Sequence, residues 1–184
     1  MKKIVQKDDL VLRMTALSVP PDEIKSAKIK KIIEEMRSAL AQESDGVGLA
    51  APQIGYSLRI FIVSEKVFSI AKEMGEKKIQ DGEIRQSHNK GLVFINPEII
   101  KLSKEKRNLE EGCLSVRPFY GKVERRTRAK IRFLDEKGNV VERGASGLMA
   151  QIFQHEVDHL NGILFTDRAK NIKEIDVLNE KDGL

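Results

Sequence analysis

The sequence is poor in several residue types, and each scarcity narrows what the protein does. Its 184 residues include one cysteine and no tryptophan, and aromatic residues make up 5% of the chain. A single cysteine excludes a disulfide within the chain. No apolar run approaches the roughly 20 residues that a membrane-spanning helix needs, and the first residues lack an apolar signal core. We therefore expect one domain over residues 1–184, located in the cytoplasm and without a membrane partner.

Charged residues are plentiful, but neither sign dominates a region. The chain has 33 basic and 28 acidic residues, a net charge of +5 and a pI of about 9.2. A basic balance can indicate a nucleic-acid partner. Here the two signs are interspersed, aromatic residues are few and no nucleic-acid-binding module is visible. The composition predicts a solvated mixed surface and no DNA partner.

The stretch Gln154–Gly162 reads QHEVDHLNG and carries the strongest chemical signal. His155 and His159 are four residues apart, so on a helix their imidazoles can bind one cation. Glu156 lies beside the first ligand, as the general base does in an H-E-x-x-H motif. A chance match in a buried helix is the alternative interpretation. The helical context of the motif favours the metal site.

Two histidines leave a catalytic metal short of the usual three protein ligands. A metzincin-like protease would have a histidine six residues after His159, where Phe165 stands. A gluzincin-like protease would take a glutamate from a later helix, and only Glu174 and Glu180 remain for that role. The other candidate is Cys113. A lone cysteine is often only a small buried residue, but two acidic residues and a glycine precede this one, which favours a shaped loop or strand edge.

A third segment, at residues 46–55, reads GVGLAAPQIG. It lacks the lysine and hydroxyl ending of a phosphate-binding loop. Its small residues let the backbone approach a ligand or metal closely, and Gln53 offers one amide as a hydrogen-bond donor. A simple turn is the alternative interpretation of such a stretch.

Together these segments resemble peptide deformylase. The resemblance is carried by GVGLAAPQ at 46–53, EGCLS at 111–115 and QHEVDH at 154–159, and it extends over residues 1–168. It implies a metal-dependent hydrolase that removes the formyl group from the N-terminal formylmethionine of newly synthesised polypeptides, with a weak ribosome association. An H-E-x-x-H endopeptidase and an inactive metal-binding relative are the alternatives. The endopeptidase would not need Cys113, and the inactive relative would not need Glu156 or Gln53.

The resemblance also implies a role for each matching residue. The implied metal ligands are Cys113, His155 and His159. The implied catalytic groups are Glu156 as the general base, and Gln53 with the backbone N–H of Leu114 as donors to the oxyanion. The implied substrate-binding residues are Val47, Gly48, Gly112, Leu148 and His155.

The ligand types narrow the metal, and the resemblance ranks the remaining ions. One thiolate and two imidazoles suit Fe²⁺, Zn²⁺, Co²⁺ and Ni²⁺ but not Mg²⁺ or Ca²⁺. The resemblance implies Fe²⁺ first, with Zn²⁺, Ni²⁺ or Co²⁺ as alternatives.

One position departs from the family pattern. Arg117 stands where the family has a proline two residues after Ser115, which puts the rim of the peptide groove in question. The spacing from Cys113 to Arg125 is retained, so the departure is a substitution. In family terms Arg125 matches one half of an ion pair with Glu111.

The patterning predicts an α+β fold. Mainly antiparallel strands surround a central buried helix that carries the H-E-x-x-H motif, and a long N-terminal amphipathic helix follows residues 20–22. We expect Ser146 or Gly147 to open the central helix and Gly162 to cap it. A short helix is expected around Val67, followed by a charged surface loop that reaches Lys90. The expected strands are 58–63, 92–95, 99–102, one around 123, 129–134 and 140–142, with a hairpin turn at 135–139.

Overall fold

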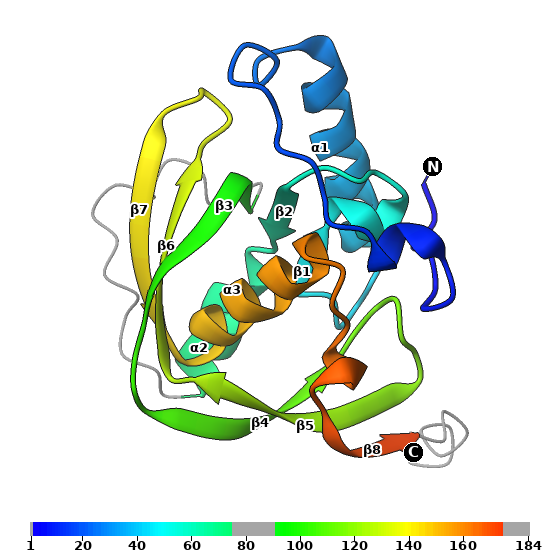
Figure 1. Cartoon of the computed structure of the whole chain (residues 1–184), viewed down its shortest axis with the longest axis vertical. Helices are drawn as coiled ribbons and strands as arrows, with labels where there is room; N and C mark the ends of the chain where they lie inside the picture. The colour runs from blue at the N-terminus through cyan, green and yellow to red at the C-terminus, as the bar shows by residue number, and fades with distance from the viewer. Residues whose placement is uncertain (1, 75–90, 175–184) are drawn as a thin grey trace.

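The computed structural model describes residues 2–74 and 91–174, and within them two antiparallel sheets flank one helix (Figure 1). The larger sheet has the order β1-β2-β3-β6-β7 and the smaller has the order β4-β5-β8. The larger sheet contains β1 (Gly48–Ala50), β2 (Ile60–Val63), β3 (Leu92–Leu102), β6 (Arg128–Leu134) and β7 (Val140–Ser146). The smaller sheet contains β4 (Lys106–Gly112), β5 (Phe119–Arg126) and β8 (Lys170–Glu174).

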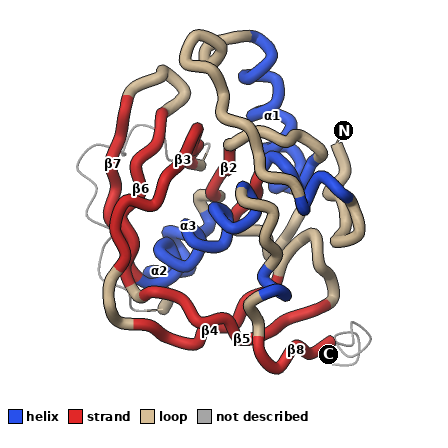
Figure 2. Tube along the Cα trace, viewed as in Figure 1, coloured by secondary structure: helices blue, strands red, loops and turns tan. Residues whose placement is uncertain are grey.

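Three α-helices accompany the sheets in the described ranges (Figure 2). They are α1 (Ala27–Ala41), α2 (Lys66–Glu73) and α3 (Gly147–Leu160), and the short 3-10 turns are η1 (Leu10–Arg13), η2 (Ala51–Ile54) and η5 (Phe165–Asp167). None of the described helices has both the length and the apolar character that crossing a membrane requires. The α+β class with antiparallel sheets is confirmed.

Strand β2 is buried on both faces. Successive side chains of a strand point in opposite directions, so alternate residues of β2 pack in different clusters. Phe61 and Val63 pack in the cluster around α3. Ile60 and Ile62 pack on the other side, with α1. Helix α1 begins after Ser26, whose Oγ accepts from the Ile29 N–H at 3.2 Å, and its buried residues are Ile29, Ile32, Ile33, Met36, Ala39 and Leu40.

Helix α3 lies between the two sheets (Figure 1), and it is apolar on several faces. Its buried apolar residues are Met149, Ala150, Ile152, Phe153, Val157 and Leu160. Ser146 is the residue before the helix, as expected. Gly162 follows it with a φ of 73°. A Cβ at Gly162 would lie 2.6 Å from the Arg13 carbonyl oxygen, so both the conformation and the close approach require glycine.

Several predicted elements differ in extent from the structure. The strands expected at 92–95 and 99–102 form one strand, β3, in which a register shift between Ile95 and Glu98 accommodates Pro97. Strand β4 directly precedes Cys113 and was not predicted, and β8 forms in a tail to which the pattern assigned no structure. The helix expected around Val67 is α2. The loop expected after it falls in 75–90, outside the described residues.

Candidate active site

The three candidate metal ligands come from two elements. Cys113 follows the last residue of β4, and His155 and His159 lie one turn apart on α3. Their ligand atoms all lie within 4.8 Å of one another, and Cys113 Sγ is 3.2 Å from His159 Nε2. Around a tetrahedral cation with metal–ligand bonds of about 2.0–2.3 Å, neighbouring ligand atoms are about 3.5 Å apart. The donor set and its spacing therefore fit one borderline-soft divalent ion.

A buried ion-pair network supports the first histidine. His155 Nδ1 lies 3.0 Å from Glu111 Oε2, which leaves Nε2 as the nitrogen for a cation. Arg125 donates to both oxygens of Glu111 at 2.8 and 2.9 Å, so the predicted ion pair is confirmed. Arg125 also donates to Asp158 at 2.6 Å, and Gln151 Nε2 donates to Glu111 at 3.3 Å. These contacts fix the ring orientation of His155.

The network also sets the charge states around the site. Burial would raise the pKa of Glu111, but hydrogen bonds with His155 and Arg125 outweigh it and lower the pKa to about 2. Glu111 is therefore a carboxylate at neutral pH. Burial lowers the pKa of His159 well below its usual range, so this imidazole is neutral, as a metal ligand must be.

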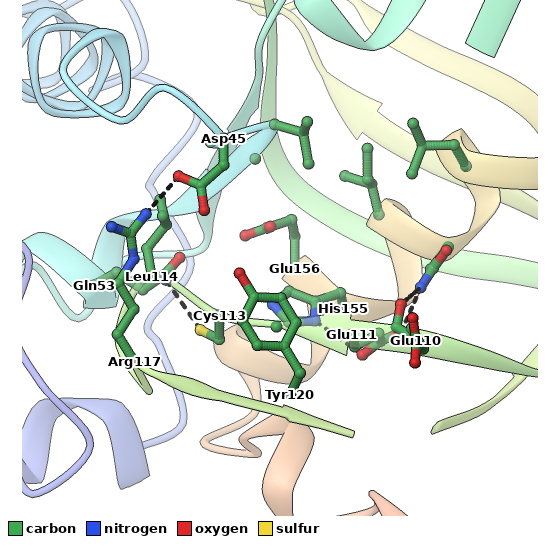
Figure 3. Close-up of a pocket in the computed structure, with 17 residues that line it drawn as sticks. Asp45, Gln53, Glu110, Glu111, Cys113, Leu114, Arg117, Tyr120, His155 and Glu156 are labelled. Carbon is green, nitrogen blue, oxygen red and sulfur yellow. Dashed lines mark hydrogen bonds and ion pairs between the residues drawn. The ribbon is translucent and has the colours of Figure 1, made fainter. Parts of the chain in front are cut away.

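Glu156 is a buried carboxylate that faces the pocket (Figure 3). Its Oε2 has no hydrogen-bond partner in the described structure. Burial raises the pKa of Glu156 to about 7, and the negative charge of Glu111 adds to this effect. A carboxylate with a pKa near neutrality can both accept and return a proton.

Gly48 of β1 lies directly against that carboxylate. A Cβ at this position would meet Glu156 Oε1 at 2.5 Å and Ile152 Cγ2 at 3.3 Å. The strand can approach α3 this closely because glycine has no side chain.

The side-chain amide of Gln53 has one fixed orientation. Its Oε1 accepts from the Ala50 N–H at 2.8 Å, which is possible only for the amide oxygen. Nε2 therefore points toward the other wall of the site, where it lies 3.2 Å from Ser115 Oγ and 3.5 Å from Cys113 Sγ. An N–H donor is thus held beside a candidate metal ligand.

The site opens into a pocket of about 290 Å³. All five predicted substrate-binding residues line it, together with Gln53, Cys113, Leu114 and Glu156. His159 is not among the lining residues and is buried beneath them. Glu111 and Arg117, which the sequence analysis singled out, also line the pocket, and the lining residues without a predicted role are Asp45, Gly46, Glu110, Tyr120, Gln151 and Ile152.

Two of these residues have clear structural roles. Arg117 forms ion pairs with Asp45 and Glu43, so it joins the segment after Cys113 to the turn before β1 (Figure 3). The Tyr120 ring covers Gly112, where a Cβ would lie 2.4 Å from Tyr120 Cε1. The departure at Arg117 does lie at the pocket rim, as predicted.

Comparisons with known proteins agree with this geometry. A family model described as polypeptide deformylase matches residues 1–174. The chain is 36% identical over 172 residues to a peptide deformylase of Mesorhizobium japonicum, across 94% of this chain and 86% of that one. The crystal structure of peptide deformylase from Thermotoga maritima has a TM-score of 0.73 at 35% identity, and the match covers 92% of this chain and 98% of that one.

A Met-Ala-Ser-bound peptide deformylase from Acinetobacter baumannii has a TM-score of 0.73 at 33% identity, over 90% of this chain and 96% of that one. The three segments that carry the resemblance lie together around one pocket here, and the family match extends over both sheets and all three helices. The chain therefore belongs to the polypeptide deformylase family, hydrolases that remove the formyl group from nascent polypeptides.

Proposed function

We propose that deformylation takes place in the pocket between β1, the end of β4 and α3. The observation that carries this proposal is the buried Glu156 carboxylate, whose Oε2 has no hydrogen-bond partner in the described part of the chain, beside the Cys113, His155 and His159 cluster. In this proposal α3 is the H-E-x-x-H helix of a single catalytic domain over residues 1–184, with α1 as its long amphipathic helix.

Cys113, His155 and His159 would hold one divalent cation. When bound, such an ion supplies a Lewis acid that polarises a carbonyl and makes water a stronger acid near neutral pH. We rank Fe²⁺ first, as the resemblance to the family implies. Zn²⁺, Ni²⁺ and Co²⁺ are the alternatives, because this donor set admits all four ions.

Glu156 would move the protons of the reaction. Its Oε2 accepts a proton from the water that attacks the formyl carbon, and then gives that proton to the departing amine nitrogen. A pKa of about 7 suits both steps, because the group is readily ionised before the attack and readily protonated after it.

Two N–H groups would stabilise the oxyanion that develops on the formyl oxygen. One is Gln53 Nε2, whose direction the Ala50 N–H fixes. The other is the backbone N–H of Leu114. Donors held in position before the reaction need no reorganisation when charge develops.

The substrate would lie in the pocket as an added strand. Val47, Gly48 and Gly112 supply backbone positions for it, and Leu148 and His155 line the space for the methionine side chain. The A. baumannii enzyme was solved with Met-Ala-Ser bound. This is the peptide that hydrolysis of formyl-Met-Ala-Ser would leave, so a peptide of that length suits this pocket as well. We place the enzyme in the cytoplasm, with weak ribosome association.

Formate release from formyl-Met-Ala-Ser tests the assignment, with acetyl-Met-Ala-Ser as the matched control. We expect release of formate from the first peptide and no deacetylation of the second. Cleavage at internal bonds of both peptides would instead indicate an endopeptidase.

Gln53→Leu should lower kcat by about 10²-fold, as loss of one oxyanion donor does elsewhere, and leave metal content unchanged. Loss of metal would mean that Gln53 has a structural role.

A further inference from the structure

Residues 4–6 lie across the two segments that carry the proposed oxyanion donors. The Val5 N–H donates to the Gln53 carbonyl oxygen at 2.9 Å. The next residue, Gln6, donates through Nε2 to the Leu114 carbonyl oxygen at 3.3 Å. Adjacent residues thus contact the backbone of both donor residues, which are far apart in the sequence.

The apolar side chains of this segment divide in the same way. Ile4 packs against the cluster that includes Ala51 and Ile54 of η2. Val5 packs against the cluster that includes Cys113 and Val116. The segment is therefore anchored on both sides of the site, and its backbone spans the junction between two core clusters.

Direct side-chain contacts across that junction come from the Gln53 amide. Gln53 Nε2 lies 3.2 Å from Ser115 Oγ and 3.5 Å from Cys113 Sγ. The first distance is at the upper end of the range for N–H···O hydrogen bonds, and the second is to sulfur, a weak acceptor. Because the Gln53 side chain is fixed to the Ala50 N–H, its position relative to Cys113 depends on where the η2 backbone lies. The Val5 hydrogen bond acts on that backbone.

We propose that residues 4–6 position the oxyanion donors, with the Val5 N–H setting the location of Gln53 and the Gln6 side chain setting that of Leu114. This inference rests on the proposed function of Gln53 and Leu114. Neither Val5 nor Gln6 lines the catalytic pocket, so both act through other residues.

Val5→Pro tests the first half, because proline keeps an apolar side chain but has no N–H. We expect kcat for formyl-Met-Ala-Ser to fall about five- to tenfold, the effect of one hydrogen bond, with KM and metal content unchanged. Lys3→Pro is the matched control, since it places the same ring in the same segment at an exposed residue without these contacts. It should leave kcat unchanged.

A double-mutant cycle separates positioning from a general loss of structure. In a Gln53→Leu background, Val5→Pro should cause little further loss, because the group that it positions is already absent. Independent multiplication of the two losses, or an unchanged kcat in Val5→Pro, would overturn the proposal. If Gln53→Leu by itself leaves kcat unchanged, the failure lies with the proposed role of Gln53 instead.

Gln6 supplies a second test that does not disturb the backbone. Its side chain is exposed, so Gln6→Leu should fold normally and lower kcat about two- to fivefold by removing one neutral hydrogen bond. Gln6→Lys retains an N–H donor and should recover most of that loss. Equal activity of the leucine and lysine variants would overturn the role of Gln6.

Discussion

At the residue scale, Gly48 and Glu156 depend on each other. The base needs a buried place without competing hydrogen bonds, and the strand that carries Gly48 provides it by lying against the carboxylate. The same approach leaves the β1 backbone next to the reacting groups. In the proposed mechanism, one glycine would therefore serve both to bind the substrate and to position the base.

Gly48→Ala should displace the Glu156 carboxylate, since the new Cβ would lie 2.5 Å from Oε1. We expect kcat to fall at least tenfold, because the base moves from its reacting position, while metal content stays unchanged. Gly144→Ala is the matched control. Gly144 has no atoms within 4 Å of its Cβ position, so this variant should retain full activity. Equal activity of the two variants would contradict the proposed contact.

Glu156→Gln should remove nearly all turnover and leave the metal bound. The amide preserves the shape of the side chain but cannot accept the proton, and general base catalysis contributes about 10²–10⁴-fold. Formate release and metal content measured on the same preparation check this prediction. Unchanged formate release in the metal-loaded variant would rule out Glu156 as the base.

At the element scale, the site joins β4, β5 and α3 through charge. Arg125 of β5 contacts Glu111 of β4 and Asp158 of α3, and the Arg125 and Glu111 side chains are 5% and 3% exposed. Asp158 also binds Arg168, at 3.0 Å, on the segment that leads to β8. The ion pairs thus hold the small sheet against the helix that carries two candidate metal ligands.

Arg125→Met should destabilise the protein by about 3–5 kcal/mol, because it leaves the buried Glu111 without its arginine and Asp158 with Arg168 alone among the described residues. Arg107→Met is the matched control on β4. Arg107 pairs with Glu105 at the surface, where their side chains are 69% and 55% exposed, and such a pair contributes about 0–1 kcal/mol. Urea unfolding of both variants measures the difference. Similar losses in the two would show that burial of the network contributes little.

The same network marks the limit of what the sequence predicts. The three candidate ligands could be predicted because His155 and His159 share a helical spacing and the chain has one cysteine, and the structure brings them together. Asp158 stands inside the same motif, but its partner Arg125 is 33 residues away. That contact depends on how α3 packs against β5, and periodicity carries no information about such packing. Strand β4 was missed because its residues KRNLEEG are mainly polar, and only Glu111 among them is fully buried.

At the scale of the whole molecule, the candidate metal ligands connect the two sheets. Cys113 directly follows β4 of the small sheet, and α3, which carries both histidines, packs against the large sheet. A cation that binds all three residues therefore links both halves of the fold. Binding to the folded state alone also stabilises it, by an amount that grows with the ion concentration relative to Kd.

Removal of the metal should consequently lower the thermal unfolding temperature, and each admissible ion should restore it. Activity, unlike the unfolding temperature, should depend on which ion is bound. We expect the anaerobically prepared Fe²⁺ form to be most active and to decay in air, through metal loss or oxidation of Cys113. Metal analysis of anaerobically isolated protein, with activity after reconstitution with Fe²⁺, Zn²⁺, Ni²⁺ and Co²⁺, tests the ranking. Cys113→Ser is the control, because replacing the thiolate should weaken the thermal response to all four ions. A fully active, air-stable zinc form beside a poorly active iron form would reverse the ranking of the metals, while the ligand assignment would still rest on the Cys113→Ser result.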